Sequence, residues 1–279
     1  MTSPSLKDSA LYLERLGYAA APPPTLETLR QLVQRHTQTF SFETINTFLH
    51  LPVPVDLSSL ERKLLHDGRG GYCYELNHLF LALLHHLGFD ARALTGRVVM
   101  GGPEDAITAR THLVVLVTVD GAPYIADVGF GGMVPTAPLR LDTEAVQSTP
   151  HEPYRIIRQG EAFLLSAEVT GEWRAMYRFD LQPQELVDLE VGNWYVATHP
   201  DSSFRGRLTA ARTGAGLRKT LQGNRFTVHR LGTPSEHHSL SSVDDIVAVL
   251  RNEFGIRVPA QPELRLAMER LLEREQQAA

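Results

Sequence analysis

Residues 69–77 of the chain read Arg-Gly-Gly-Tyr-Cys-Tyr-Glu-Leu-Asn and contain Cys73, the only cysteine. Apolar residues recur at helical spacing from Cys73 to Leu87, and Gly88 is a residue type that commonly follows a helix end. We therefore predict a helix that begins at Cys73. The free N–H groups and partial positive charge of a helix start stabilise a thiolate and can receive a developing oxyanion. Cys73 is thus a candidate nucleophile, whereas the common alternative for a lone cysteine is a small buried apolar residue.

A hairpin is predicted further along the chain. Residues 112–119 are mostly apolar with β-branched side chains, an Asp120-Gly121 turn signal follows, and residues 124–128 resume the strand pattern. In the simplest register, Val119 faces Ala122.

This register brings a histidine and an aspartate together. His112 is placed opposite Gly129, and Asp127 is placed opposite Val114, so both polar side chains lie on one face as diagonal neighbours. Burying such a pair in an apolar hairpin is unfavourable unless the two groups satisfy each other. A nucleophilic cysteine needs a base and a group that orients the base, so we predict a triad of Cys73, His112 and Asp127. The alternative is a core histidine with a structural carboxylate.

Three regions of the chain differ in pattern, and together they indicate an α+β fold. Residues 1–88 are mostly helical in pattern and carry the candidate nucleophile. Residues 89–205 follow the period of two that is typical of strands, and they carry His112 and Asp127. Residues 206–279 mix short strands with helices. Thr25 is a predicted N-cap, a serine of the Ser241-Ser242 pair is predicted to cap a second helix, and the last helix is expected over about residues 262–274.

Composition excludes several classes of protein. Of 279 residues, 43% are hydrophobic and 21% are charged, as in globular proteins. The formal net charge of −5 does not favour a nucleic-acid or membrane partner, and no apolar stretch is long enough to span a membrane. A single cysteine excludes an internal disulfide, and no signal peptide is recognised at the N-terminus. We expect a cytoplasmic protein without nucleic-acid or membrane partners.

Three motifs resemble the signature of the arylamine N-acetyltransferases: Arg69–Asn77, Thr111–Leu113 and Ala126–Gly131. Residues 36–45 and 193–204 are similar to further blocks of that family. The resemblance implies an N-terminal helical bundle over 1–88, a central β-barrel over 89–205 and a C-terminal α/β lid over 206–279. It also implies a catalytic core like that of cysteine proteases and transglutaminases.

The resemblance assigns roles to the triad. Cys73 is implied to be the acyl-accepting nucleophile, His112 the general acid and base, and Asp127 the group that orients the imidazole. Four further residues are implied to line the acyl and arylamine pocket: Phe42, Phe130, Gly131 and Phe204. Three residues of the first motif are expected to be structural, holding the Gly-Gly turn and the helix start: Arg69, Glu75 and Asn77.

The implied reaction is a ping-pong acetyl transfer from acetyl-CoA to arylamines, arylhydrazines or N-hydroxyarylamines through an acetyl-cysteine. It requires no permanently bound cofactor and no metal. Two alternatives are a cysteine-triad amide hydrolase or transglutaminase-like enzyme, and a binding protein on a decayed transferase scaffold.

A basic stretch offers a partner for the phosphates of coenzyme A. Residues 201–230 contain seven Lys or Arg side chains and a single acidic residue, Asp201, within an acidic chain. These cations are either phosphate ligands or ordinary solvated groups. Gly129–Gly132 lacks the spacing of a dinucleotide-binding loop. His85-His86 and His237-His238 lack the spacing of metal ligands.

Overall fold

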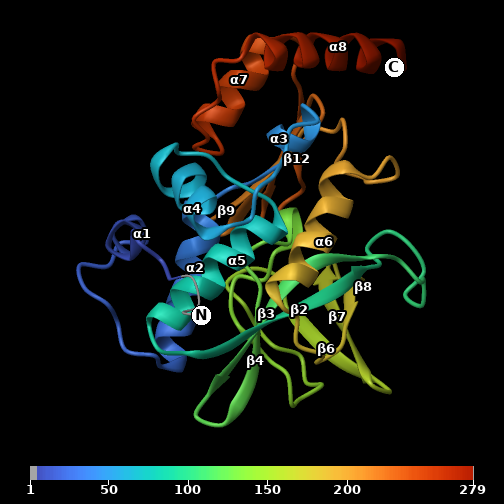
Figure 1. The fold of residues 1–279 in the computed structure, drawn as a ribbon. Helices are drawn as coiled ribbons and strands as arrows, with labels where there is room; N and C mark the ends of the chain where they lie inside the picture. The colour runs from blue at the N-terminus through green and yellow to red at the C-terminus, as the bar shows by residue number, and fades with distance from the viewer. Residues whose placement is uncertain (1–4, 279) are drawn as a thin grey trace.

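Helix α5 (Cys73–His86) lies between the N-terminal helices and a curved sheet, near the centre of the fold (Figure 1). The computed structural model describes residues 5–278. The helix begins at Cys73 and ends before Gly88, as predicted. Gly88 adopts φ 84°, and the amides of Gly88 and Phe89 donate to the carbonyls of His85 and Leu84. This pair of bonds is a Schellman motif, which explains why the glycine stands there.

The remaining helical segments flank α5 or follow the sheets. They are α1 (Ser9–Arg15), α2 (Leu26–Thr39), α3 (Ile45–Phe48), α4 (Leu57–Leu60), the π-helical η1 (Glu61–His66), the 3₁₀ turn η2 (Gly131–Met133), α6 (Leu186–Thr198), α7 (Val243–Asn252) and α8 (Pro262–Ala278). Both predicted N-caps are confirmed: Thr25 Oγ1 accepts from the amide of Thr28, and Ser242 Oγ accepts from the amide of Asp245.

A seven-stranded antiparallel sheet forms the middle of the molecule, with the order β5-β4-β3-β2-β8-β7-β6. Its strands are β2 (Asp90–Val98), β3 (Arg110–Val119), β4 (Ala122–Ala126), β5 (Leu139–Arg140), β6 (Tyr154–Gln159), β7 (Ala162–Val169) and β8 (Glu172–Phe179). The edge strands β5 and β6 contact each other, so the sheet curls into an almost closed barrel around its own apolar core. The predicted α+β architecture is confirmed.

The hairpin of β3 and β4 has the predicted register at its turn, because Val119 pairs with Ala122. The predicted pairings of His112 with Gly129 and of Asp127 with Val114 are wrong, since β4 ends at Ala126. Beyond that residue the backbone leaves the sheet, and the amide of Gly129 donates to the Asp127 carboxylate instead of to a strand.

A second, five-stranded sheet combines one strand from the N-terminal region of the chain with four strands from the C-terminal region. Its order is β1-β9-β10-β11-β12, with β1 (Phe42–Glu43), β9 (Thr209–Gly214), β10 (Leu217–Gln222), β11 (Arg225–Arg230) and β12 (Glu236–Ser239). Phe42 pairs with Ala211, so the N-terminal region supplies one edge of the sheet. Helices α7 and α8 lie at this end of the molecule and share an apolar core with the sheet (Figure 1).

Helix α6 lies in a region for which the sequence pattern indicated strands. Leu189 and Val196 are buried on one side of α6, whereas Val187, Val191 and Trp194 are exposed on the other. A helix with apolar side chains on both faces shows no amphipathic period, and for this reason the sequence pattern did not predict α6. No helix among residues 5–278 combines the length and apolarity required to cross a bilayer.

Gly192 allows α6 to pack against the start of α5. A methyl group at Gly192 would overlap the hydroxyl of Tyr74, and this hydroxyl donates to the carbonyl of Arg110. Gly192→Ala should therefore lower the free energy of unfolding by about 1–3 kcal/mol through overpacking. Inside a helix, a change from glycine to alanine normally raises the free energy of unfolding by about 1 kcal/mol, so the effect expected here has the opposite sign.

Urea denaturation followed by circular dichroism measures this effect. The matched control is Val191→Ala, because that neighbouring side chain is exposed and its truncation should change the unfolding free energy by less than about 0.5 kcal/mol. A stabilised Gly192→Ala protein would show that the α5–α6 contact is loose.

Candidate active site

Two close approaches explain the Gly-Gly pair before Cys73. A side chain at Gly70 would overlap the carbonyl oxygen of Ser41, and the amide of Gly71 donates to that same oxygen over 3.2 Å. A Cβ at Gly71 would lie 2.7 Å from the Cβ of Glu75. The chain therefore passes between β1 and the first turn of α5 only because both residues lack a side chain.

Cys73 lies at the first position of α5, with its side chain almost fully buried and facing a cleft. Its Sγ lies 3.5 Å from the carbonyl oxygen of Thr111, the residue before His112. A Cβ at Gly129 would lie 2.8 Å from the Cα of Cys73, so this glycine lets the loop after β4 pack directly on the nucleophile's backbone.

Asp127 is completely buried and accepts four hydrogen bonds. Its Oδ2 accepts from His112 Nε2 over 2.7 Å and from the Tyr177 hydroxyl over 3.0 Å. Its Oδ1 accepts from Asn77 Nδ2 and from the amide of Gly129, each over 2.9 Å. Burial alone would raise the pKa of Asp127, but His112 and these donors outweigh it and lower that pKa below its usual value.

His112 is held as an imidazolium. Burial opposes its charge, but the Asp127 carboxylate and hydrogen bonds to Asp127 and Cys73 outweigh burial and raise the pKa of His112 to about 10. A raised pKa means that the charged form is the stable one in the folded protein at neutral pH. The arrangement can therefore keep a positive imidazolium next to the Cys73 sulfur, which favours a thiolate.

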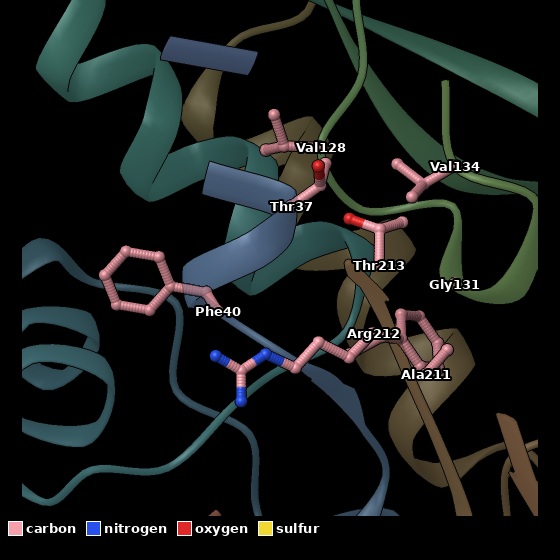
Figure 2. A pocket seen from close by; sticks show the side chains of 9 residues that line it. Thr37, Phe40, Val128, Gly131, Val134, Ala211, Arg212 and Thr213 are labelled. Atoms are coloured by element: carbon pink, nitrogen blue, oxygen red, sulfur yellow. The ribbon is translucent and has the colours of Figure 1, made fainter. Parts of the chain in front are cut away.

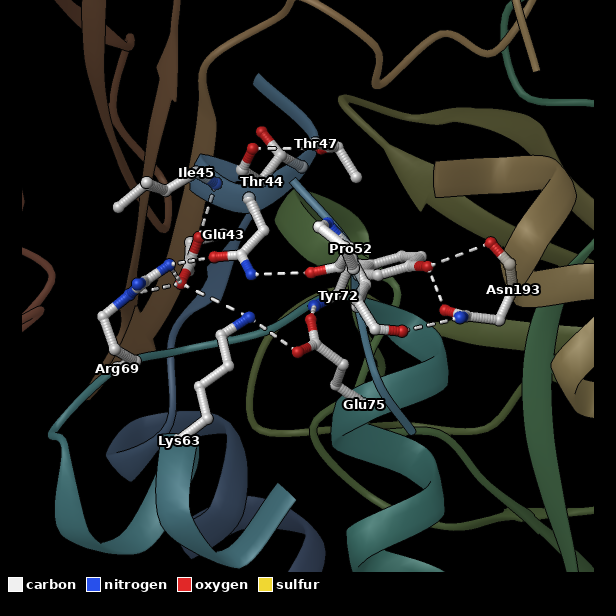
Figure 3. A network of polar contacts seen from close by, with 12 residues as sticks. Glu43, Thr44, Ile45, Thr47, Pro52, Lys63, Arg69, Tyr72, Glu75 and Asn193 are labelled. Carbon is white, nitrogen blue, oxygen red and sulfur yellow. Dashed lines mark hydrogen bonds and ion pairs between the residues drawn. The ribbon is translucent and has the colours of Figure 1, made fainter. Parts of the chain in front are cut away.

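Asn77 holds a different part of the site from the one that the sequence indicated. Its amide nitrogen donates to the carbonyl of Leu113 over 2.7 Å and to Asp127, and its oxygen accepts from the amide of Val128 over 2.9 Å. It joins α5 to strand β3 and to the loop that follows β4. By contrast, Glu75 and Arg69 do hold the helix start and the turn, through the amide of Tyr72 and the carboxylate of Glu43 (Figure 3).

A cleft of about 1100 Å³ opens in front of the triad, and Cys73 and His112 both line it. All four residues that the resemblance placed in a substrate pocket line the same cleft: Phe42, Phe130, Gly131 and Phe204. The Phe130 ring lies 4.9 Å from the His112 ring, and the Phe42 and Phe204 rings lie 5.8 Å apart. Aromatic rings thus form part of the wall of the cleft that Cys73 lines.

A second, much smaller space lies between α2, β9 and the segment from Val128 to Val134 (Figure 2). It measures about 10 Å³ and is lined by Thr37, Phe40, Arg212 and Thr213, among others. This volume is the size of one water molecule, so the space is too small for a substrate.

Most cations of the basic stretch do not reach the cleft. Arg218 is buried in an ion pair with Glu152, the Lys219 ammonium lies 2.6 Å from a Glu253 oxygen, and Arg212 donates to a backbone carbonyl. The stretch is therefore not one phosphate-facing surface. Of the seven Lys and Arg side chains in this stretch, only Arg207 lines the cleft, and Arg274 of α8 lines it as well.

Sequence reasoning missed Tyr177. This residue lies on β8 and donates to Asp127, and the centre of its ring lies 4.7 Å from that of the His112 ring and 5.0 Å from that of the Phe130 ring. Its only sequence signal is membership of an alternating strand, which does not say which strand it will face. Within residues 5–278, no group of three or more His, Cys, Asp or Glu side chains is arranged to bind a metal.

Comparison with known proteins gives a consistent result. A family model described as N-acetyltransferase matches residues 25–263. The arylamine N-acetyltransferase of Mycolicibacterium smegmatis is 44% identical over 250 residues, which cover 88% of this chain and 90% of that protein. The Salmonella typhimurium arylamine N-acetyltransferase / N-hydroxyarylamine O-acetyltransferase is 39% identical over 248 residues, covering 88% of each chain.

The solved structure of Mycobacterium marinum arylamine N-acetyltransferase in complex with CoA superimposes with a TM-score of 0.90. It is 42% identical and covers 95% of this chain and 99% of that one.

The pH dependence of Cys73 alkylation tests whether His112 is paired with the sulfur. Alkylation of Cys73 by iodoacetamide should remain fast down to about pH 6, because the thiolate is paired with a cation. In His112→Ala the rate should instead follow an ordinary thiol and rise only toward about pH 8.5.

The control is His86→Ala, which removes an exposed histidine from the same helix and should leave the profile unchanged. An identical pH profile for His112→Ala and the native protein would show that His112 is not the partner of the sulfur.

Proposed function

The chain belongs to the arylamine N-acetyltransferase family, and from this premise we propose that it transfers acetyl groups from acetyl-CoA to aromatic amines through Cys73. The observation that carries the proposal is that Cys73 and His112 line one cleft while His112 is hydrogen-bonded to the buried Asp127. The proposed acceptors are arylamines, arylhydrazines and N-hydroxyarylamines. The relative from Salmonella typhimurium bears a name that covers arylamine N- and N-hydroxyarylamine O-acetylation.

The first half-reaction moves the acetyl group to the enzyme. The Cys73 thiolate attacks the thioester carbonyl, the bond from that carbon to the CoA sulfur breaks, and the CoA thiolate takes the proton of the His112 imidazolium. Free N–H groups at the start of α5 are suited to the negative oxygen of the intermediate. One thioester replaces another, so the step needs no metal and no permanently bound cofactor.

The second half-reaction releases the acetyl group to the amine. The amine nitrogen attacks the acetyl-cysteine, the carbon–Sγ bond breaks, and neutral His112 accepts the proton that the nitrogen loses. This restores the thiolate and the imidazolium. Asp127 supports both steps because its carboxylate stabilises the charged ring and fixes which nitrogen faces the sulfur.

The lining of the cleft supports aromatic acceptors and a nucleotide donor. Phe42, Phe130 and Phe204 offer flat apolar surfaces next to the sulfur, where an arylamine ring would stack. Arg207 and Arg274 line the same cleft and are the cations proposed for the CoA phosphates. The Mycobacterium marinum relative has been solved with CoA. We propose a cytoplasmic enzyme with small-molecule partners and without nucleic-acid partners.

The covalent intermediate is the direct consequence of the mechanism. Acetyl-CoA supplied without an acceptor should add one acetyl group to the protein, and peptide mass spectrometry should locate it on Cys73. Cys73→Ser should remain unmodified, because a serine hydroxyl is far less ionised beside the same imidazole. Subsequent aniline should remove the acetyl group and yield acetanilide. A label on lysine, or acetyl-CoA hydrolysis that an arylamine does not divert, would contradict the transferase mechanism.

The phosphate contacts are tested by the KM for acetyl-CoA. Arg207→Ala and Arg274→Ala should each raise it about ten-fold or more, the usual effect of losing a charge-assisted hydrogen bond. Transfer from preformed acetyl-enzyme to the amine should not change, since CoA has already left. Arg270→Ala removes an exposed arginine one turn earlier on α8 and should leave the KM unchanged. An unaltered KM in both cleft variants would place the phosphates elsewhere.

A further inference from the structure

Two carboxylates are buried beside the first turn of α5. Glu75, at the third position of the helix, accepts from the amide of Tyr72 over 3.0 Å and has a side chain only 1% exposed. Glu43 on β1 is fully buried and accepts from the amide of Ile45 over 2.6 Å. Negative charge at this place satisfies backbone donors, but it also opposes the positive end of the helix on which the thiolate of Cys73 depends.

Arg69 already has its partners. Its guanidinium donates twice to Glu43 Oε1, over 2.9 and 2.6 Å, and once to the Asn46 side-chain oxygen over 3.0 Å. These contacts hold the turn that leads into the Gly-Gly pair against β1. Arg69 therefore compensates Glu43, and the charge of Glu75 needs a second cation.

Lys63 is that cation. It comes from η1 (Glu61–His66), and its Nζ lies 2.6 Å from Glu75 Oε1 and 3.8 Å from Glu43 Oε1 (Figure 3). Its side chain is 14% exposed, so solvent screens the contact weakly. Burial raises the pKa of Glu75, and the Lys63 ammonium opposes that rise. The cluster then holds two positive and two negative charges.

We propose that Lys63 is a positioning residue for the nucleophile: its ammonium cancels the charge of the Glu75 cap, so that the positive end of α5 acts on Cys73. The proposal rests on the role of Cys73 given above, but it concerns the state of the sulfur and not the acyl donor. Nothing in the sequence pattern singles out Lys63, which lies ten residues before the cysteine.

The other ionisable groups around Cys73 do not supply this compensation. His112 approaches the sulfur from the sheet side, and the Asp127 carboxylate bonded to it balances its charge. Tyr72 and Tyr74 flank it on the chain, and burial raises the pKa of both hydroxyls, so they stay neutral. The charge on the α5 side is therefore set by Glu75 and Lys63, with Glu43 and Arg69 behind them.

The test is the pH dependence of Cys73 alkylation by iodoacetamide in the full-length protein. In Lys63→Met the Glu75 charge is uncompensated, so the rate at pH 6.5 should fall about three- to ten-fold. At high pH, where every thiol is ionised, the rates should converge on the native value. Loss of structure alone would lower or raise the high-pH plateau as well.

Three further variants test the sign of the effect and its dependence on charge. Glu75→Gln keeps an oxygen that can accept from Tyr72 and leaves the Lys63 ammonium in excess, so alkylation should extend to lower pH than in the native protein. Lys63→Met combined with Glu75→Gln removes both charges and should restore the native profile. Lys63→Arg keeps the charge and should also resemble the native protein.

The outcomes separate this proposal from the proposed function. If Lys63→Met has the native profile, or if Glu75→Gln shifts the profile to higher pH, the proposal is overturned. If Lys63→Met does not fold, the comparison of Glu75→Gln with the double variant still measures the effect of the ammonium on the sulfur. Failure of acetyl transfer to any amine would overturn the proposed function and would leave these alkylation profiles, and the conclusion about Lys63, intact.

Discussion

The site depends on the burial of one carboxylate. An ionised carboxylate without donors is too unfavourable inside a protein, and Asp127, which is fully buried, obtains four of them. They come from α5 through Asn77, from β3 through His112, from β8 through Tyr177 and from the loop after β4 through Gly129. Satisfying this one group therefore fixes the helix, the barrel strands and the loop relative to one another, and the positions of the cysteine and the histidine follow.

The same constraint operates on the other side of α5. Glu43 and Glu75 are also buried, and their partners Arg69 and Lys63 join β1 and η1 to the start of the helix. Because β1 belongs to the five-stranded sheet, this cluster connects the C-terminal part of the chain to the nucleophile. Cys73 thus lies between two buried charge clusters, each of which is neutral as a whole.

Features with a local cause could be predicted from the sequence. The αL glycine at 88, the caps at Thr25 and Ser242 and the turn at Asp120-Gly121 each act within a few residues, so their residue types were sufficient. The meeting of His112 and Asp127 was also predicted and the two side chains are hydrogen-bonded, but the hairpin pairing expected to bring them together ends at Ala126.

Features that depend on distant partners could not be predicted. Tyr177 reaches Asp127 only because β8 pairs with β2. Lys219 forms an ion pair with Glu253, which lies 34 residues further along the chain. Helix α6 shows no amphipathic period because its exposed face is apolar.

The most direct test of the proposed active site is an NMR titration of His112 in ¹³C-histidine-labelled protein, with His112→Ala used to assign the signal. His112 should stay protonated through neutral pH and titrate near 10, above the 6.5 of a free imidazole. Titration near 6.5 would contradict the buried thiolate–imidazolium–carboxylate arrangement.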